Sequence, residues 1–427
     1  MEPFYNHIND QYQVWKPCQT TEVDWIDVSE IWLDQNANKV EQRKRIHHRD
    51  IPAWLNQTVE GHSRLLQLVW VNFRHMEKVY DISSPVLELL LENFHIEVAA
   101  QWNRTAFASL SSFPPVQYAN DLVFSYSSSK YPKTAAAWSH IPSKNLTRGV
   151  FFATQDRIPR LQSLLGSMKA AAGHQMLVAL VFGMSLSGIV ENVHMEIKDK
   201  VHQVEVRTRF HPWTSLSEAP AQGSYPSLLQ KMTGAKTRLA SLCKKTEILQ
   251  ETCGFIRENL FCKHEGAVSL DISVSDLAKE AAEVIERYTR VLEKRTALQK
   301  ADIRYFQERT EAQHVTLSNM ILHRQATASM AIANANMQDS LSLKTLALVT
   351  MIFLPGTFLA TVFSMPLLKW DGDGHEKVIN NRFWVYWALA IPLTILTFAT
   401  WGFWTFYLQS NDKRVKVKLE GIGDAET

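Results

Sequence analysis

The chain has 427 residues, of which 46% are hydrophobic and 21% are charged, and its formal net charge is +2. This balance provides no basic field for nucleic acid, and the length leaves room for a soluble domain of ordinary size plus membrane helices. The four cysteines, Cys18, Cys243, Cys253 and Cys262, are too widely spaced for a CxxC pair. We therefore expect neither a zinc site nor a disulfide framework. The chain also lacks the GxxxxGK, GxSxG, HExxH and dinucleotide-binding motifs, so we expect no enzyme and no cofactor.

The first 60 residues form a polar N-terminal segment with a charge cluster from Lys39 to Asp50, KVEQRKRIHHRD. We interpret this cluster as a solvated surface helix or loop, although it could also touch anionic lipid or an acidic partner. The N-terminus has neither the apolar core of a secretory signal nor the Arg-rich character of a transit peptide. The first membrane helix is therefore expected to act as the insertion signal and to leave the preceding residues in the cytosol.

Residues 61–210 have the pattern of a mixed α/β domain. Leu65 to Val71, LLQLVWV, is a short apolar run that predicts a buried strand. Further strand candidates are Val116 to Tyr126 and Gly149 to Ala153. Ser83-Ser84-Pro85 predicts a helix start with a serine cap and a proline in the first turn. Met176 to Leu186 is apolar but too short to span a bilayer, so we expect a core helix there.

A linker rich in Pro, Ser and Gly is predicted at residues 211–227, and a helical region follows at 228–342. From Ser275 a long helix is expected to run without Pro or Gly toward the first uncharged segment. Its apolar positions recur at helical spacing and form one stripe: Ile285, Tyr288, Leu292, Ile303, Phe306, Leu317 and Ile321. The stripe fits an ordinary coiled coil, but its continuation into an uncharged segment favours a stalk that holds an oligomer together.

Charge nearly disappears between His323 and Ser340, where Ala, Ser, Thr and Asn dominate. Small residues allow helices to approach closely, and Asn side chains can line a wet channel. If several copies surround an axis, either Asn334 or Asn336, together with Asp339, could present rings of oxygen atoms to cations. The spacing of these residues prevents all three from facing the axis together.

Two uncharged segments follow, Thr345 to Leu368 and Phe383 to Leu408. About 20 apolar residues in a helix suffice to cross a bilayer core that is roughly 30 Å thick. We therefore predict a membrane hairpin and a basic tail, and the absence of a signal peptide together with that tail places both termini in the cytosol. The predicted elements are a first transmembrane helix at 343–368, an external loop at 369–382, a second transmembrane helix at 383–409 and the tail at 410–427.

The first span has a polar face. Thr350, Thr357, Thr361 and Ser364 recur at spacings of 7, 4 and 3, so they share one side of a helix. This side fits packing against another helix and the lining of a pore equally well. Pro355-Gly356 lies in the middle of the span and frees one backbone carbonyl, which a membrane protein tolerates where a neighbouring helix or water satisfies it.

The string LKTLALVTMIFLPGTFLATVFSMPL, from Leu343 to Leu367, is followed by a short acidic loop and a second span. This region resembles the CorA-type magnesium transporters, and most closely their fungal CorA-like branch. The resemblance implies a homopentamer in which the first span lines the pore and the second packs outside it. It also implies an α+β cytoplasmic domain followed by a long stalk helix and the two-helix transmembrane hairpin. The family signature Gly-Met-Asn falls on Ser364-Met365-Pro366, where only Met365 matches.

The resemblance implies two groups of site residues. The pore-lining positions are Leu343, Leu346, Thr350, Thr357, Thr361, Ser364 and Met365. The positions at the pore mouth are Pro366, Asp371, Asp373 and Glu376. The loop that carries the acidic residues has Asp-Gly-Asp-Gly turn chemistry, which also fits a plain polar turn. No protein ligand for a fixed metal ion follows from the sequence.

The sequence therefore predicts a multi-pass membrane protein of CorA-like architecture that passes a divalent cation, magnesium or a related metal, with altered selectivity. The alternative is a non-conducting interaction or regulatory protein that is anchored in the membrane and keeps this architecture. The changed signature favours the alternative, whereas the Pro-Gly-Thr pore helix and the acidic loop favour conduction. The expected partners are further copies of the chain, divalent cations and the lipid of the plasma membrane or an internal membrane, with no nucleic acid.

Overall fold

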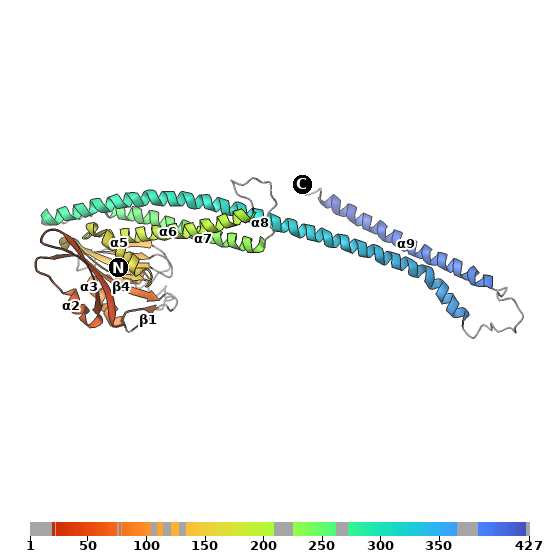
Figure 1. The fold of residues 1–427 in the computed structure, drawn as a ribbon, viewed down its shortest axis with the longest axis horizontal. Helices are drawn as coiled ribbons and strands as arrows, with labels where there is room; N and C mark the ends of the chain where they lie inside the picture. Colours follow the sequence, from red (N-terminus) through yellow and green to blue (C-terminus); the bar gives the residue numbers. More distant parts are fainter. Residues whose placement is uncertain are drawn as a thin grey trace. The chain divides into compact units, whose positions relative to one another are not determined.

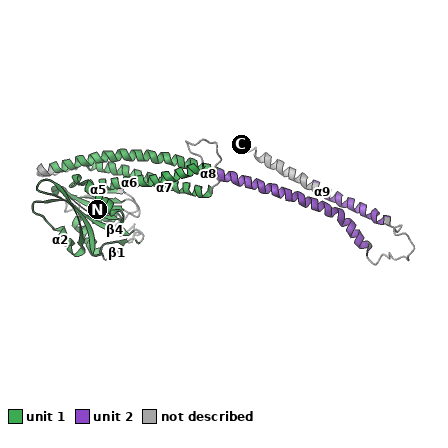
Figure 2. Cartoon of the chain, viewed as in Figure 1, with its two compact units in different colours: residues 1–319 green, residues 320–427 purple. Residues whose placement is uncertain are grey.

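The computed structural model describes residues 19–21, 23–74, 77, 79–103, 109–113, 121–127, 134–208, 225–261, 272–364 and 383–423. The chain divides into two compact units, residues 1–319 and 320–427, which Figure 2 shows in different colours. The first unit contains the sheet and the first part of α8 (Ile272–Phe363), and the second contains the rest of α8 and α9 (Phe383–Gly423). The predicted class, an α+β domain followed by a long helix and a second apolar helix, is confirmed (Figure 1).

Nine strands within the described residues form one sheet in the first unit. They are β1 (Gln19–Thr20), β2 (Trp25–Leu33), β3 (Lys39–His47), β4 (Ser63–Arg74), β5 (Val79–Tyr80), β6 (Ser109–Phe113), β7 (Leu122–Ser127), β8 (Thr134–Ile141) and β9 (Leu146–Ala153). The order is β3-β2-β4-β9-β8-β7-β6, and the short β5 joins the end of β4 to β1. The pairs β4–β9 and β1–β5 are parallel, whereas β2–β3, β2–β4, β6–β7, β7–β8 and β8–β9 are antiparallel.

Strand β4 is buried on both faces, as its short apolar run predicts, and it buries one polar residue of that run, Gln67. Successive side chains of a strand point to opposite faces, so Leu66 and Leu68 enter one core and Val69 and Val71 enter another. The predicted strand at residues 149–153 lies within β9. Of the predicted strand at residues 116–126, the described part begins at Asp121, and β7 runs from Leu122.

Helices cover both faces of the sheet. The face of Leu66 and Leu68 packs against α5 (Ile158–Ser167), α6 (Leu177–Thr208), α7 (Tyr225–Glu258) and the first part of α8. The other face packs against α2 (Ile51–Leu55), α3 (Ser84–Phe94) and α4 (Glu97–Trp102). Among the described residues, three short 3-10 helices connect these elements: η1 (His48–Asp50), η2 (Pro142–Lys144) and η3 (Lys169–Ala171).

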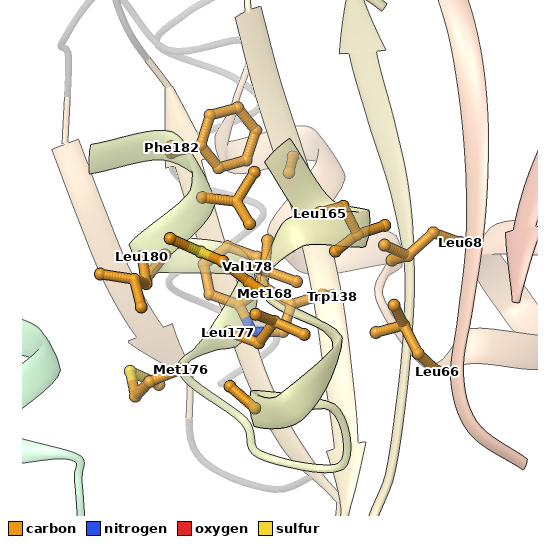
Figure 3. Close-up of a cluster of buried hydrophobic side chains, with 14 of the residues drawn as sticks. Leu66, Leu68, Trp138, Leu165, Met168, Met176, Leu177, Val178, Leu180 and Phe182 are labelled. Carbon is orange, nitrogen blue, oxygen red and sulfur yellow. The ribbon is translucent and has the colours of Figure 1, made fainter. Parts of the chain in front are cut away.

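Trp138 of β8 lies in the centre of the first core, with its side chain fully buried. Its indole N–H donates to the Gln175 carbonyl at 2.9 Å, which satisfies the one polar group of this side chain. Figure 3 shows Trp138 together with side chains of the same core from β4, α5, the residue that follows α5, and α6. They include Leu66, Leu68, Leu165, Met168, Leu177 and Val178. The apolar segment predicted at residues 176–186 is therefore a core helix, although α6 is much longer than that segment.

The charged segment from Lys39 to Asp50 was wrongly predicted as a surface helix or loop. Lys39 to His47 form β3, which pairs with β2 from Trp25–His47 to Leu33–Lys39. Among the described strands, β3 pairs with β2 alone, and most of its side chains are exposed. Charged side chains on an edge strand discourage the addition of a further strand. They also remove the apolar alternation by which a strand is recognised in a sequence, which explains the error.

The start of α3 follows the prediction in position and departs from it in chemistry. Ser83 is the N-cap residue and Pro85 lies in the first turn, but the Ser83 side chain makes no capping hydrogen bond. The Ser84 hydroxyl instead donates to Glu88 at 3.1 Å, one turn further along the helix. The predicted serine cap is therefore formed by backbone conformation without the side-chain bond.

The apolar stripe on the first part of α8 packs inside the chain. Ile285 and Leu292 belong to the core beneath the sheet, and Ile303, Phe306 and Leu317 pack against α6 and α7. Tyr288 is partly exposed. The expectation that this stripe holds an oligomer together is therefore wrong, because α6 and α7 cover it within one copy. Of the predicted linker, residues 225–227 begin α7 and the others lie outside the described residues.

Candidate functional site

Three helices in the described part of the chain are long and apolar enough to cross a membrane, namely α6, α8 and α9. In α6, 61% of the most apolar window is buried inside the protein, whereas in α8 and α9 this share is 6%. The apolar windows of α8 and α9 are thus exposed in one copy. Lipid or further helices must cover them, because exposing this much apolar surface to water is unfavourable.

Six of the predicted pore-lining residues lie on α8 or directly after it. They are Leu343, Leu346, Thr350, Thr357, Thr361 and Ser364. Their side chains are all exposed. Because successive residues of an α-helix are about 100° apart, the six fall within about 60° of the helix circumference. We call this exposed strip of the helix the α8 face.

The hydroxyl groups on the α8 face use their protons within the helix. Thr350 donates to the Leu346 and Ala347 carbonyls at 3.1 and 2.8 Å, and Thr357 donates to the carbonyls three and four residues before it. Thr361 and Ser364 likewise donate to carbonyls of the preceding turn. Each hydroxyl oxygen keeps lone pairs that can accept from outside. The α8 face therefore presents acceptors, which suit a hydrated cation.

The same face continues toward the N-terminal end of the helix. By helical phase Asp339 falls on the α8 face and Asn336 lies about 20° beyond its edge, whereas Asn334 lies about 160° from Thr350. Asn336 and Asp339 are exposed. Of the alternatives that the spacing left open, α8 thus aligns Asn336 and Asp339 with the predicted pore residues. Extending the phase of the hydroxyl stripe upstream would have identified this pair from the sequence.

Helix α9 packs beside the α8 face and leaves most of it open. The Tyr386 hydroxyl donates to the Gly356 carbonyl at 3.1 Å, next to the buried Pro355. A cavity of about 570 Å³ lies along this contact, between α8 and α9. The α8 residues that line the cavity are centred about 80° from the α8 face, and Thr357 borders both. Tyr386 was not predicted, because pairing two helices at a given residue requires the tertiary structure.

The remaining predicted site residues lie outside the described residues. These are Met365, Pro366, Asp371, Asp373 and Glu376. Within the described part of the chain, no group of three or more His, Cys, Asp or Glu side chains is arranged to hold a metal ion. Helix α9 continues past the predicted end of the second span to Gly423 and so includes most of the predicted tail.

Comparison with known proteins gives partial similarities. No protein-family model matches the sequence. Notoamide biosynthesis cluster protein M' of Aspergillus versicolor is 41% identical over 59 residues, which are 14% of this chain and 13% of that protein. The match to the structure of the full-length CmaX protein spans 89% of this chain and 98% of that chain, with a TM-score of 0.35 and 14% identity. The match to the ZntB cytoplasmic domain from Vibrio parahaemolyticus RIMD 2210633 spans 66% of this chain and 98% of that chain, with a TM-score of 0.31 and 12% identity.

Proposed function

We propose that the chain is a CorA-type membrane protein that conducts a divalent metal cation along the α8 face, with several copies surrounding the path. The observation that carries this proposal is the α8 face itself, which gathers Asp339 and a row of hydroxyl oxygens on one exposed strip of a helix, with Asn336 beside it. One helix cannot enclose a path for an ion. A path forms when equivalent strips from several copies face a common axis.

Residues 322–346 of α8 support the association of several copies. Every side chain from residue 322 to residue 346 is exposed in one copy. Large apolar side chains among them are Leu322, Met330, Ile332, Met337, Leu341, Leu343 and Leu346. Between them lie Ala, Ser and Asn, which allow close helix approach. A homopentamer is the assembly that the CorA resemblance implies, and the exposed segment would supply its interface, because the stripe from Ile285 to Leu317 is mostly covered by the same copy.

The charge of the α8 face favours cations. Asp339 contributes one carboxylate per copy, so an assembly has a ring of negative charge. Lys344, the basic residue next along the chain, lies about 120° from Thr350. The resemblance to CorA-type transporters makes magnesium or a related divalent metal the ion that we propose. Magnesium keeps its inner water shell tightly, so a pore binds it best through those waters.

Flux into liposomes tests the proposal. Full-length protein reconstituted into vesicles should carry magnesium, cobalt, nickel or zinc down an imposed gradient, with empty vesicles as the control. Absence of flux for all four ions, from protein shown to be folded and inserted, would contradict conduction. That result would favour the alternative, a non-conducting interaction or regulatory protein, for which the loss of two residues of Gly-Met-Asn at Ser364-Met365-Pro366 is the specific observation.

We expect Pro366→Asn to sharpen the preference for magnesium over cobalt, nickel and zinc. Asn supplies a directed carbonyl oxygen that can accept hydrogen bonds from the waters of a hydrated ion, whereas proline supplies none. The measurement is the ratio of initial flux rates for the four ions in the variant and in the unmodified protein. Pro366→Ala is the matched control, because it removes the proline side chain without adding a hydrogen-bond acceptor. An equal change of selectivity in both variants would contradict the role of the added acceptor.

A further inference from the structure

The cavity between α8 and α9 is open, elongated and lined by uncharged residues. From α8 it is lined by Ile352, Phe353, Gly356, Thr357 and Ala360, and from α9 by Tyr386, Trp387, Ala390, Ile391, Thr394 and Ile395. We call it the hairpin groove. Phe353, Ile391 and Ile395 keep more than half of their surface exposed, so the groove opens to whatever surrounds the two helices. In a membrane hairpin, that surrounding is the hydrocarbon of the bilayer.

The hydroxyl groups in the groove wall donate their protons within the protein. Tyr386 donates to the Gly356 carbonyl at 3.1 Å, Thr394 donates to the Ala390 carbonyl at 2.8 Å, and Thr357 donates to its own helix. These three hydroxyl groups therefore have no proton left to donate to a ligand in the groove, and most of the remaining wall is apolar. Its chemistry suits a hydrocarbon chain.

The length of the groove matches one leaflet. From Tyr386 to Ile395 the lining of α9 extends over nine residue steps, which is about 14 Å along a helix. Half of a bilayer core is about 15 Å. The Tyr386 end carries Trp387, and exposed aromatic residues at the start of a span lie at the level of the lipid headgroups. A lipid with its headgroup at that end would place one chain along the groove.

The two helices approach each other closely at the base of the groove, where the Tyr386 hydroxyl donates to the Gly356 carbonyl at 3.1 Å. Gly356 contributes to the narrow base, since a side chain there would meet the Tyr386 hydroxyl oxygen at 3.3 Å.

We propose that the hairpin groove binds one acyl chain of a bilayer lipid, in the leaflet on the side of the 369–382 loop. The proposal goes beyond ion conduction and requires only that α8 and α9 form a membrane hairpin. Its occupant contacts Gly356 and Thr357, so the lipid lies against the point where α8 contains Pro355. Conduction along the α8 face can be present or absent without changing what the groove binds.

Photo-crosslinking from two matched positions tests the proposal. Ile391 lines the groove and is 52% exposed, whereas Leu389 is 51% exposed and does not line it. The two lie at nearly the same depth and about 160° apart on α9. A benzophenone amino acid is placed at one position or the other in the full-length protein. The protein is then irradiated in phosphatidylcholine vesicles that contain an alkyne-tagged acyl chain.

We expect lipid adducts at position 391 to exceed those at 389 by about threefold or more, which corresponds to a modest difference in occupancy. Ala360→Phe fills the groove and should abolish that excess, whereas Leu348→Phe, on another side of α8, should preserve it. Equal labelling at 391 and 389 would show ordinary surrounding lipid and would overturn the proposal. A crosslink between two chains from position 391 would show that a second copy covers the groove, and this would also overturn it. The flux of metal ions enters none of these readouts.

Discussion

Thr350→Phe should reduce divalent-cation flux by about tenfold or more, which corresponds to about 1.4 kcal/mol or more added to the barrier. Thr350 lies in the middle of the α8 face and is exposed in one copy. If copies meet around an axis at this face, each adds a bulky apolar ring where a hydroxyl oxygen had been. The ring narrows the path and removes an acceptor for the waters of the ion.

Leu348→Phe is the matched control for that variant. Leu348 is two residues away on the same helix and is also exposed, but it lies about 160° from Thr350. Its substitution should leave the flux unchanged, because the added ring faces away from the path. The measurement is initial flux into liposomes at equal protein density, with the mass of the assembly in detergent checked for each variant. Equal fluxes for the two variants would place the ion path elsewhere.

Arg309→Ala should lower the free energy of unfolding by about 3–5 kcal/mol. Arg309 of α8 binds Glu205 of α6 through two hydrogen bonds, with Nε 3.0 Å from Oε1 and Nη2 2.5 Å from Oε2. Glu205 is 2% exposed, so the substitution would remove both of these hydrogen bonds from a buried carboxylate, and the exposed His202 ring, with Nδ1 4.0 Å from Oε2, is too distant to replace them. Burial opposes the charge of Arg309, but the hydrogen bonds to Glu205 outweigh it and raise the pKa of Arg309. The guanidinium also lies 4.7 Å from the centre of the Phe306 ring.

Arg290→Ala provides the control for that prediction on the same helix. Arg290 pairs with Glu286 one turn away, and the side chains are 72% and 37% exposed. An exposed pair of this kind contributes about 0.5 kcal/mol or less. Denaturant unfolding of the full-length protein in detergent, followed by tryptophan fluorescence, should therefore separate the two variants clearly. Adding Glu205→Leu to Arg309→Ala should recover much of the loss, because no buried charge is then left unpaired. Similar midpoints for Arg309→Ala and Arg290→Ala would contradict the assigned role.

The apolar patterns predicted which residues are buried more reliably than they predicted which elements cover them. The run from Leu65 to Val71 identified a strand buried on both faces, because a segment with apolar residues at both odd and even positions is stable only when both faces are covered. The stripe from Ile285 to Leu317 correctly marked one covered face of α8. The periodicity did not reveal that α6 and α7 cover it, since a periodic face is equally satisfied by its own chain or by another copy.

Part of the candidate site was accessible to sequence reasoning. The spacing of Thr350, Thr357, Thr361 and Ser364 fixes their common side as soon as the segment is helical. The contact between Tyr386 and Gly356 was not accessible, because a hydrogen bond between two helices depends on their rotation and depth as well as on their composition. The groove beside that contact was missed for the same reason.

The sequence by itself determined the two exposed apolar helices, the phase of the α8 face and the strands with apolar runs, because these depend on local periodicity and on the cost of exposing apolar surface. The tertiary structure alone decided that Lys39–His47 is an edge strand, because its pairing with β2 is made by backbone groups that every residue carries. It also decided that the stripe of α8 is covered by α6 and α7, and that α9 leaves the α8 face open. Each of these depends on which surfaces the folded chain brings together, and residue spacing along one segment does not contain that information.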